Sequence, residues 1–157
     1  MGVCLAGLVI WSDEIAGEAK AIHVRVRRTL RELEIPGELE WTGGSSVPRT
    51  LTRGDVDLHL RVPAESFATT VAILKDHFPI GSPHSWAETL AVFDIPDQPL
   101  PTGLAVTPIY SEHDRRFTRA WSRIAADPDV HRRYNDLKRH TTDDYESRKA
   151  AFFNDLT

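Results

Sequence analysis

The spacing of apolar residues divides the first part of the chain into a strand and an amphipathic helix. The apolar run at 5–11 predicts a short buried strand, and Ser12 follows it in the position of a helix N-cap. Apolar residues then recur every three or four positions until Pro36-Gly37, where the helix is expected to end. The stripe of this predicted helix consists of Ile15, Ala19, Ile22, Val26, Leu30 and Leu33.

The middle of the chain predicts short strands separated by turns. The clearest strand is 55–62, in which polar and apolar residues alternate without interruption. Pro63 then opens a helix whose apolar residues return to a spacing of four or three. Further strands are predicted at 39–42, 89–95 and 104–109, the last two as a hairpin, and one helical turn at 47–51.

The last third of the chain predicts helices. Ser111 is placed to cap one helix, Asp127-Pro128 separates it from the next, and the segment 141–144 caps the last. Strands followed by helices predict the α+β class. The absence of a linker or repeat predicts a single domain spanning 1–157. The stripe of the last helix consists of Tyr145, Lys149, Phe152 and Leu156.

Composition excludes several classes of protein. Hydrophobic residues make up 41% and charged residues 27%, which is typical of a folded chain and not of a disordered one. There is no apolar run of ~20 residues and no basic start typical of a signal peptide, so we expect a cytoplasmic protein without a membrane partner. The net charge of -4 gives no indication of a nucleic-acid partner. A single cysteine, Cys4, excludes an internal disulfide and a multi-cysteine metal site.

Candidate chemistry begins on the strand at 55–62. Side chains two positions apart share a face of a strand, so Asp55, Asp57, His59 and Arg61 line the face opposite the apolar one. The two aspartates are about 6.6 Å apart along the strand, at about 3.3 Å per residue. Their carboxylates can therefore converge on one hard cation such as Mg²⁺, which takes oxygen ligands. Taken alone, the pattern also fits an ordinary strand with one solvated face.

A glycine- and serine-rich turn precedes this strand. The segment 43–46 reads Gly-Gly-Ser-Ser and follows the predicted strand at 39–42. Glycine lets a phosphate approach the backbone closely, and serine hydroxyls donate hydrogen bonds to its oxygens. Such a turn is common by itself. Together with the Asp-x-Asp strand it indicates a site in which the turn holds a triphosphate and the carboxylates hold its metal.

These two motifs resemble the signature of the DNA polymerase β nucleotidyltransferase superfamily, with Gly44-Ser45 followed by Gly-Asp-Val-Asp-Leu at 54–58. The chain is more closely similar to the GrpB family of small bacterial nucleotidyltransferase-like proteins. The segment 43–48 resembles the Gly-Ser-x-x-Val-Pro turn of that family, and Arg53 stands where the family usually has a lysine. The segment 134–139, Tyr145 and the segment 149–152 resemble its tail. The resemblance covers nearly the whole chain. It implies a minimal nucleotidyltransferase fold, with a short mixed β-sheet, helices packed on one face and a helical C-terminal third.

The resemblance also implies roles for individual residues. Asp55 and Asp57 would be catalytic carboxylates and ligands of Mg²⁺. The terminal phosphates of a nucleoside triphosphate would be bound by the turn, with two cationic side chains as supports. The implied phosphate-binding residues are Gly44, Ser45, Ser46, Arg53 and Lys149.

Two of the implied assignments have a second interpretation. Superfamily enzymes usually take a third carboxylate from a later strand, and the stretch 104–108 contains no acid. Asp94 on the neighbouring predicted strand is the nearest substitute, but it also fits a plain surface aspartate. Lys149 either buries its stem and extends its ammonium into water, or binds a phosphate with it.

The resulting hypothesis is a protein that binds a nucleotide with Mg²⁺ and transfers a nucleoside monophosphate to an unknown acceptor. One alternative is a non-catalytic nucleotide- or ligand-binding module that has lost the third carboxylate. Another is an interaction domain that binds neither metal nor nucleotide.

Overall fold

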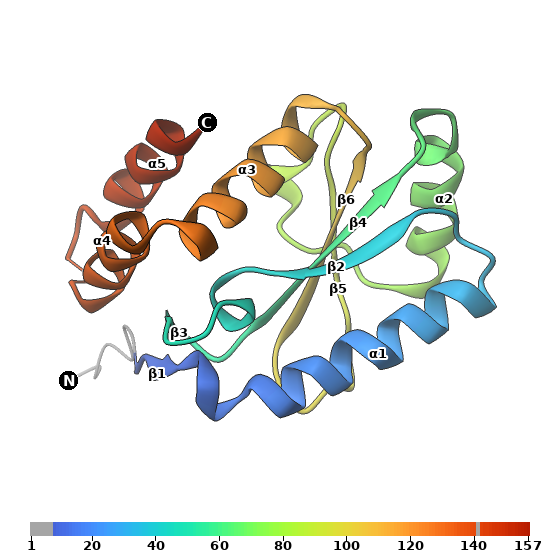
Figure 1. Cartoon of the computed structure of the whole chain (residues 1–157). Helices are drawn as coiled ribbons and strands as arrows, with labels where there is room; N and C mark the ends of the chain where they lie inside the picture. Colours follow the sequence, from blue (N-terminus) through green and yellow to red (C-terminus); the bar gives the residue numbers. More distant parts are fainter. Residues whose placement is uncertain (1–7, 141) are drawn as a thin grey trace.

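The computed structural model describes residues 8–140 and 142–157, in which four strands form a mixed sheet in the order β2-β4-β6-β5 (Figure 1). β4 and β6 lie parallel in the centre, and the edge strands β2 and β5 run antiparallel to them. The bounds are Glu38–Thr42 for β2, Val56–Val62 for β4, Ala91–Asp94 for β5 and Thr102–Pro108 for β6. β1 (Ile10–Trp11) and β3 (Leu51–Thr52) pair separately as a small antiparallel sheet.

Two helices cover one face of the four-stranded sheet and enclose the main core. α1 (Ala16–Glu32) and α2 (Phe67–His77) pack on the apolar face of β4. Each aliphatic side chain buried there contributes about 1.5–3 kcal/mol, so this face is the main source of stability. The principal core residues are Ala19, Ile22, Val26, Leu30 and Leu74 from the helices and Val56, Leu58, Leu60, Val62, Phe93, Leu104 and Val106 from the strands.

The opposite face of the sheet is crossed by α3 (Glu112–Ala126), which one buried carboxylate fixes to β4. Asp114 is 1% exposed. It accepts hydrogen bonds from Arg61 Nε at 2.6 Å, from Arg61 Nη2 at 2.9 Å and from the Tyr110 N–H at 2.8 Å. Beside it, the His59 ring packs edge-on against Phe117. This part of the polar face of β4 is therefore covered by a helix.

The C-terminal third forms a second core. α4 (Pro128–Arg139) and α5 (Tyr145–Leu156) lie at the end of the molecule where β1 and β3 pair (Figure 1). The side chain of Asn135 accepts a hydrogen bond from the Leu51 N–H at 2.9 Å and donates one to the Arg49 carbonyl at 3.0 Å. These bonds attach α4 to β3. The second core consists of Val47, Ala120, Ile124, Val130, Tyr134, Leu137, Tyr145, Phe152 and Leu156.

The predicted α+β class and helical C-terminal third are confirmed, and so are the cap at Ser111 and the break between two helices at Asp127-Pro128. The side chain of Ser111 accepts from the Asp114 N–H at 3.3 Å, and that of Asp127 accepts from the Asp129 N–H at 2.9 Å. The predicted strand at 5–11 is described only from residue 8 onward, and Cys4 and Thr141 lie outside the described residues.

Two local predictions are wrong. Ser12 is not an N-cap: its hydroxyl donates to the Val47 carbonyl at 2.6 Å and accepts from the Thr50 N–H at 3.1 Å, so it joins two distant segments instead. The helical turn expected at 47–51 is absent, because Val47 is extended and the turn falls earlier, at Gly44–Ser46. The turn of the glycine–serine motif is therefore itself the helical segment.

Replacement of Asp114 with Asn should lower the free energy of unfolding by about 3 kcal/mol, because breaking a buried ion pair leaves an uncompensated charge. Burial alone would raise the pKa of Asp114, but the hydrogen bonds from Arg61 and the Tyr110 N–H outweigh it and lower the pKa. Urea denaturation at pH 7 measures the loss. The matched control is Asp129→Asn, which removes an exposed pair with Arg132 at 3.0 Å and should cost less than about 1 kcal/mol. Equal losses in the two variants would contradict the role given to Asp114.

Candidate functional site

The carboxylate of Asp57 lies directly against the glycine turn that follows β2. Thr42, the last residue of β2, is paired with Asp57 across the sheet. Gly43 has a φ of 76°, and a Cβ at this position would lie 2.2 Å from Asp57 Oδ2. Any side chain at 43 would displace the carboxylate. The two motifs that the sequence singled out therefore meet in space.

Asp55 and Asp57 differ in their surroundings. Asp55 is exposed, whereas Asp57 is half-buried under the turn. Burial raises the pKa of Asp57 from 3.8 to about 6, and the Asp55 carboxylate acts in the same direction. The charges of Lys149 and Lys138 act in the opposite direction. Ionisation of Asp57 therefore costs free energy, because its carboxylate is half-buried and lies near the charge of Asp55.

Cationic and aromatic side chains from α4, α5 and the loop after β3 gather around the aspartates. Lys138 Nζ lies 5.6 Å from the ring centre of Tyr134 and 5.8 Å from that of Tyr145. Arg53 Cζ lies 5.2 Å from the ring centre of Tyr145. A cation over an aromatic face is attracted by the ring quadrupole. The two rings therefore hold Lys138 and Arg53 beside the acidic strand, and Lys149 lies within electrostatic reach of Asp57.

The hydroxyls of the turn are engaged within the protein. Ser45 is buried and accepts a hydrogen bond from Trp41 Nε1 at 2.9 Å, while Ser46 Oγ donates to the Gly43 carbonyl at 2.7 Å. A Cβ on Gly44 would lie 3.2 Å from the hydroxyl of Tyr134. The turn is thus packed between Asp57 and α4. Ser45 keeps its own hydroxyl proton for a further bond, and Ser46 keeps its acceptor positions.

Asp94 stands in line with Asp57 across the sheet. Both residues pair with Gly103 of β6, so they share the face that α3 crosses. Their Cα atoms are separated by two strand spacings, or about 10 Å. Among residues 8–140 and 142–157, no group of three His, Cys, Asp or Glu side chains is placed to hold one metal ion. Asp55 and Asp57, at the start of β4, therefore offer two carboxylates, and Asp94 stands apart from them.

Sequence reasoning missed Lys138, Tyr134 and Tyr145 as parts of this site. All three lie in the tail segments that carry the family resemblance. Their spacing predicts that they lie on helices, but it does not predict that α4 packs against the turn after β2. That docking depends on the hydrogen bonds of Asn135 to the segment before β3, which connect residues far apart in sequence.

Two adjoining cavities open beneath α3 on the face of the sheet that carries Asp57. The smaller has a volume of about 190 Å³ and reaches Asp57, while the larger, about 440 Å³, extends to Arg61. Phe117 and Trp121 of α3 line both. The two cavities therefore adjoin between the helix and the sheet, and the smaller one lies beside Asp57.

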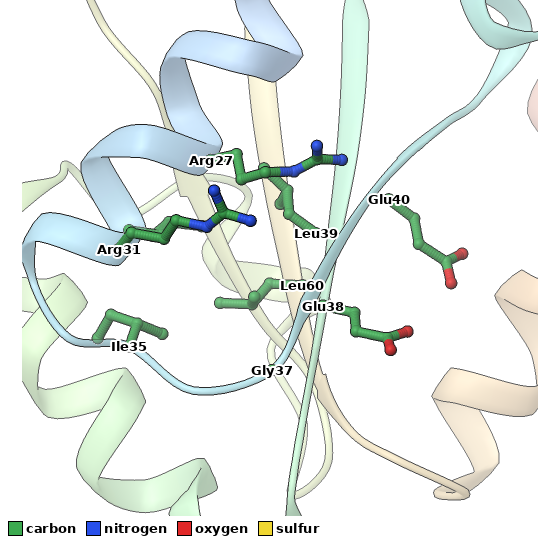
Figure 2. Close-up of a pocket in the computed structure, with 9 residues that line it drawn as sticks. Arg27, Arg31, Ile35, Gly37, Glu38, Leu39, Glu40 and Leu60 are labelled. Carbon is green, nitrogen blue, oxygen red and sulfur yellow. The ribbon is translucent and has the colours of Figure 1, made fainter.

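A separate hollow of about 330 Å³ lies between α1 and β2. Arg27 and Arg31 line it from the helix, while Glu38 and Glu40 point away from both arginines on the other side of β2 (Figure 2). Its floor is formed by Leu30, Leu39 and Leu60, which belong to the core on the sheet face that α1 and α2 cover. It is not part of the site at Asp57.

The mixed sheet, its two helices on one face and the turn beside the aspartates define a nucleotidyltransferase-type α+β fold. GrpB, a conserved protein from Enterococcus faecalis, shares it with a TM-score of 0.65 and 12% identity, over 88% of this chain and 89% of GrpB. The Cid1 poly(U) polymerase, solved with Mg and 3′-dATP bound, matches with a TM-score of 0.55 and 13% identity, over 82% of this chain and 41% of Cid1. No family model and no curated protein matches the sequence.

These similarities confirm the predicted fold: the chain shares its architecture with GrpB and with 41% of the Cid1 chain. Identities of 12% and 13% establish the fold and not the activity. None of the helices described is long and apolar enough to cross a lipid bilayer.

Replacement of Asp57 with Asn should stabilise the protein at pH 7, by about 1–3 kcal/mol. The folded protein binds the Asp57 proton more tightly than the unfolded chain, because the pKa rises from 3.8 to about 6. Ionised Asp57 therefore costs stability above pH 6, and this cost disappears as the pH falls toward 4. Urea denaturation of both proteins from pH 7 to pH 4 should show the difference closing. A constant difference, or one no larger than that of the exposed Asp76→Asn control, would contradict the environment assigned to Asp57.

Proposed function

We propose that this protein binds a nucleoside triphosphate together with Mg²⁺ where the turn after β2 meets the start of β4. The observation that supports the proposal is that acidic and basic side chains lie near one another at this place without forming ion pairs. Asp57 lies within electrostatic reach of Lys138 and Lys149, but in the described part of the chain no ion pair joins Asp55 or Asp57 to either lysine. A metal triphosphate carries both complementary charges, a cation for the carboxylates and an anion for the ammonium groups.

The two aspartates fit Mg²⁺ as a donor set. This ion usually takes one or two protein carboxylates and completes its shell with water and phosphate oxygens. The repulsion by Asp55 that contributes to the raised pKa of Asp57 is the kind that a divalent cation relieves. Bound Mg²⁺ would supply neutralisation of the phosphate charge and orientation of the triphosphate. A cytoplasmic location, where Mg²⁺ and nucleoside triphosphates occur together, belongs to the same proposal.

The turn and the surrounding cations would hold the phosphates. Gly44 offers a backbone without a side chain, and the hydroxyl proton left on Ser45 can be donated to a phosphate oxygen. Ser46 would first have to release the Gly43 carbonyl to donate its own proton. Arg53 and Lys149 are the cationic supports expected from the family resemblance. Lys138 joins them because its charge, like that of Lys149, acts on Asp57.

Transfer of a nucleoside monophosphate to an acceptor is the second candidate, and the register of Asp94 favours it. An attacking hydroxyl needs a group that takes its proton, and Asp94 stands on the same face and in the same row as Asp57. Without such a group the protein would be the non-catalytic binding module. Pyrophosphate release from the four ribonucleoside triphosphates, measured with and without Mg²⁺, distinguishes the two.

The double variant Asp55→Asn, Asp57→Asn should lose Mg²⁺-dependent nucleotide binding, because a neutral amide is a much weaker ligand for a hard cation. Titration calorimetry with Mg-ATP and the other three triphosphates measures the affinity. The control is Asp76→Asn on α2, an exposed aspartate outside the site. Both proteins should remain folded. Unchanged affinity in the double variant would overturn the metal site.

Replacement of Lys149 with Met keeps the bulk of the stem and removes the charge. If Lys149 binds a phosphate, the affinity for Mg-ATP should fall by about 1.5–3 kcal/mol, the size of a hydrogen bond to a charged group. If the ammonium extends into water instead, the affinity should equal that of the wild type. The matched control is Lys20→Met on α1, an exposed lysine on the helix that covers the other sheet face. Measurements at one fixed salt concentration keep the comparison valid.

A further inference from the structure

The hollow between α1 and β2 is bordered by two arginine side chains that have no carboxylate partner. Arg27 and Arg31 lie four residues apart on α1, which places them about one turn apart, roughly 6 Å along the helix axis. Both extend from the helix toward β2 (Figure 2). In the described part of the chain neither arginine takes part in an ion pair. Both guanidinium groups are therefore available to an anion.

The acidic residues of β2 do not neutralise these arginines. Glu38 and Glu40 extend from the other side of the strand, away from both guanidinium groups (Figure 2). The Glu40 carboxylate also has a partner on that side, since its Oε1 accepts a hydrogen bond from Arg61 Nη1 at 3.3 Å. The charged side chains that β2 and α1 direct into the hollow are therefore positive.

Arg27 also lacks an acceptor in its own surroundings. Its side chain is half-buried, and Nη2 lies 3.2 Å from His23 Nε2. The same nitrogen of His23 lies 2.9 Å from the carbonyl oxygen of Leu39, a buried residue. A guanidinium only donates and a carbonyl only accepts, so Nε2 can serve one of them and not both. Because a buried carbonyl needs a donor, Nε2–H donates to Leu39, and no described residue then accepts from Arg27.

The hollow has an apolar floor and an end that is fixed by the backbone. Its floor consists of Leu30, Leu39 and Leu60, all of them buried. The Ile35 N–H donates to the Leu30 carbonyl at 3.0 Å, which fixes the chain where α1 ends. Gly37 has a φ of 110°, and a Cβ there would lie 2.2 Å from the Arg61 carbonyl oxygen, so the chain passes directly against β4. The space of about 330 Å³ is therefore held between fixed elements.

We propose that this hollow binds a phosphomonoester that carries a small apolar group. A phosphomonoester has a charge of about −1.5 to −2 at pH 7 and three strong acceptor oxygens, so it can accept from two guanidinium groups at once. A carboxylate has one charge and two oxygens and matches this pair less well. Sites for small molecules begin at roughly 300 Å³, so the hollow holds a phosphate and about one ring over the leucines.

This inference does not depend on the proposed function. The hollow lies on the sheet face that α1 and α2 cover, whereas Asp57 lies on the face that α3 crosses. Arg27 and Arg31 belong to α1, and the cations near Asp57 belong to α4, α5 and the loop after β3. A phosphate in the hollow is therefore a second ligand and not part of the nucleoside triphosphate.

The test uses 4-fluorophenyl phosphate as the probe and the full chain at one fixed salt concentration. Fluorine NMR measures its affinity and that of 4-fluorobenzoate, which keeps the ring but has a single charge. Inorganic phosphate, which has no ring, is measured by competition with the bound probe. The variants are Arg27→Gln, Arg31→Gln and both together. The matched control is Arg28→Gln, which changes an exposed arginine of the same helix that does not line the hollow.

We expect the wild type and Arg28→Gln to bind 4-fluorophenyl phosphate with affinities within about twofold of each other. Each of the two single variants should weaken binding about tenfold or more, because each removes a charge-assisted hydrogen bond. 4-Fluorobenzoate and inorganic phosphate should each bind the wild type about tenfold more weakly or less tightly still. Arg31 is exposed, so Arg31→Gln keeps the test valid if the variants of Arg27 fail to fold.

Each other outcome overturns a distinct statement. Failure of the wild type to bind 4-fluorophenyl phosphate, or equal binding in folded variants of Arg27 and Arg31, overturns the site. A loss in Lys149→Met in place of these variants assigns the probe to the cations near Asp57 and overturns the site as well. Equal binding of 4-fluorobenzoate overturns the phosphomonoester, and equal binding of inorganic phosphate overturns the apolar group. Failure of the wild type to bind Mg-ATP overturns the proposed function alone, since the probe reports on the hollow separately.

Discussion

The ion pair between Arg61 and Asp114 is the contact on which the site depends most. A carboxylate buried to 1% exposure is tolerated only when it is paired and fully hydrogen-bonded, and Asp114 obtains both from β4 and from the segment before α3. The pair fixes where α3 begins on the sheet. α3 leads into α4 and α5, which carry Lys138 and Lys149. The pair therefore fixes the start of the helical segment that leads to the cationic half of the site, and Asn135 then attaches α4 to the backbone around β3.

β4 explains how one strand serves both the core and the site. Its apolar residues face α1 and α2, while its polar residues face α3, and each polar residue has a different environment. Asp55 is exposed and Asp57 half-buried, whereas His59 is 1% exposed with its Nε2 2.8 Å from Thr107 Oγ1. Burial thus increases from the acidic pair toward the centre of the sheet. The proposed metal ligand Asp55 therefore has access to solvent, whereas His59 does not.

Features that depend on residues close in sequence could be predicted from the sequence. Features that depend on the packing of one element against a distant one could not. The alternation at 55–62 identified β4 and its acidic face, and the turn at 43–46 lies close enough in sequence to be joined to it. Lys138 and Tyr134 could not be assigned, because α4 reaches the turn through Asn135 and the backbone before β3. Ser12 illustrates the same limit. Its sequence position fits a cap, but tertiary bonds to Val47 and Thr50 take its hydroxyl.

Two glycines stand on either side of Asp57, and they are present for different physical reasons. Gly43 has a left-handed backbone and a carboxylate oxygen 2.2 Å from where its Cβ would be, so no other residue fits without moving Asp57. Gly103 has neither constraint, and an alanine there would fit. Gly103 therefore leaves the face of β6 beside Asp57 without a side chain. The first glycine lets the turn approach the carboxylate, and the second keeps the other side of the carboxylate open.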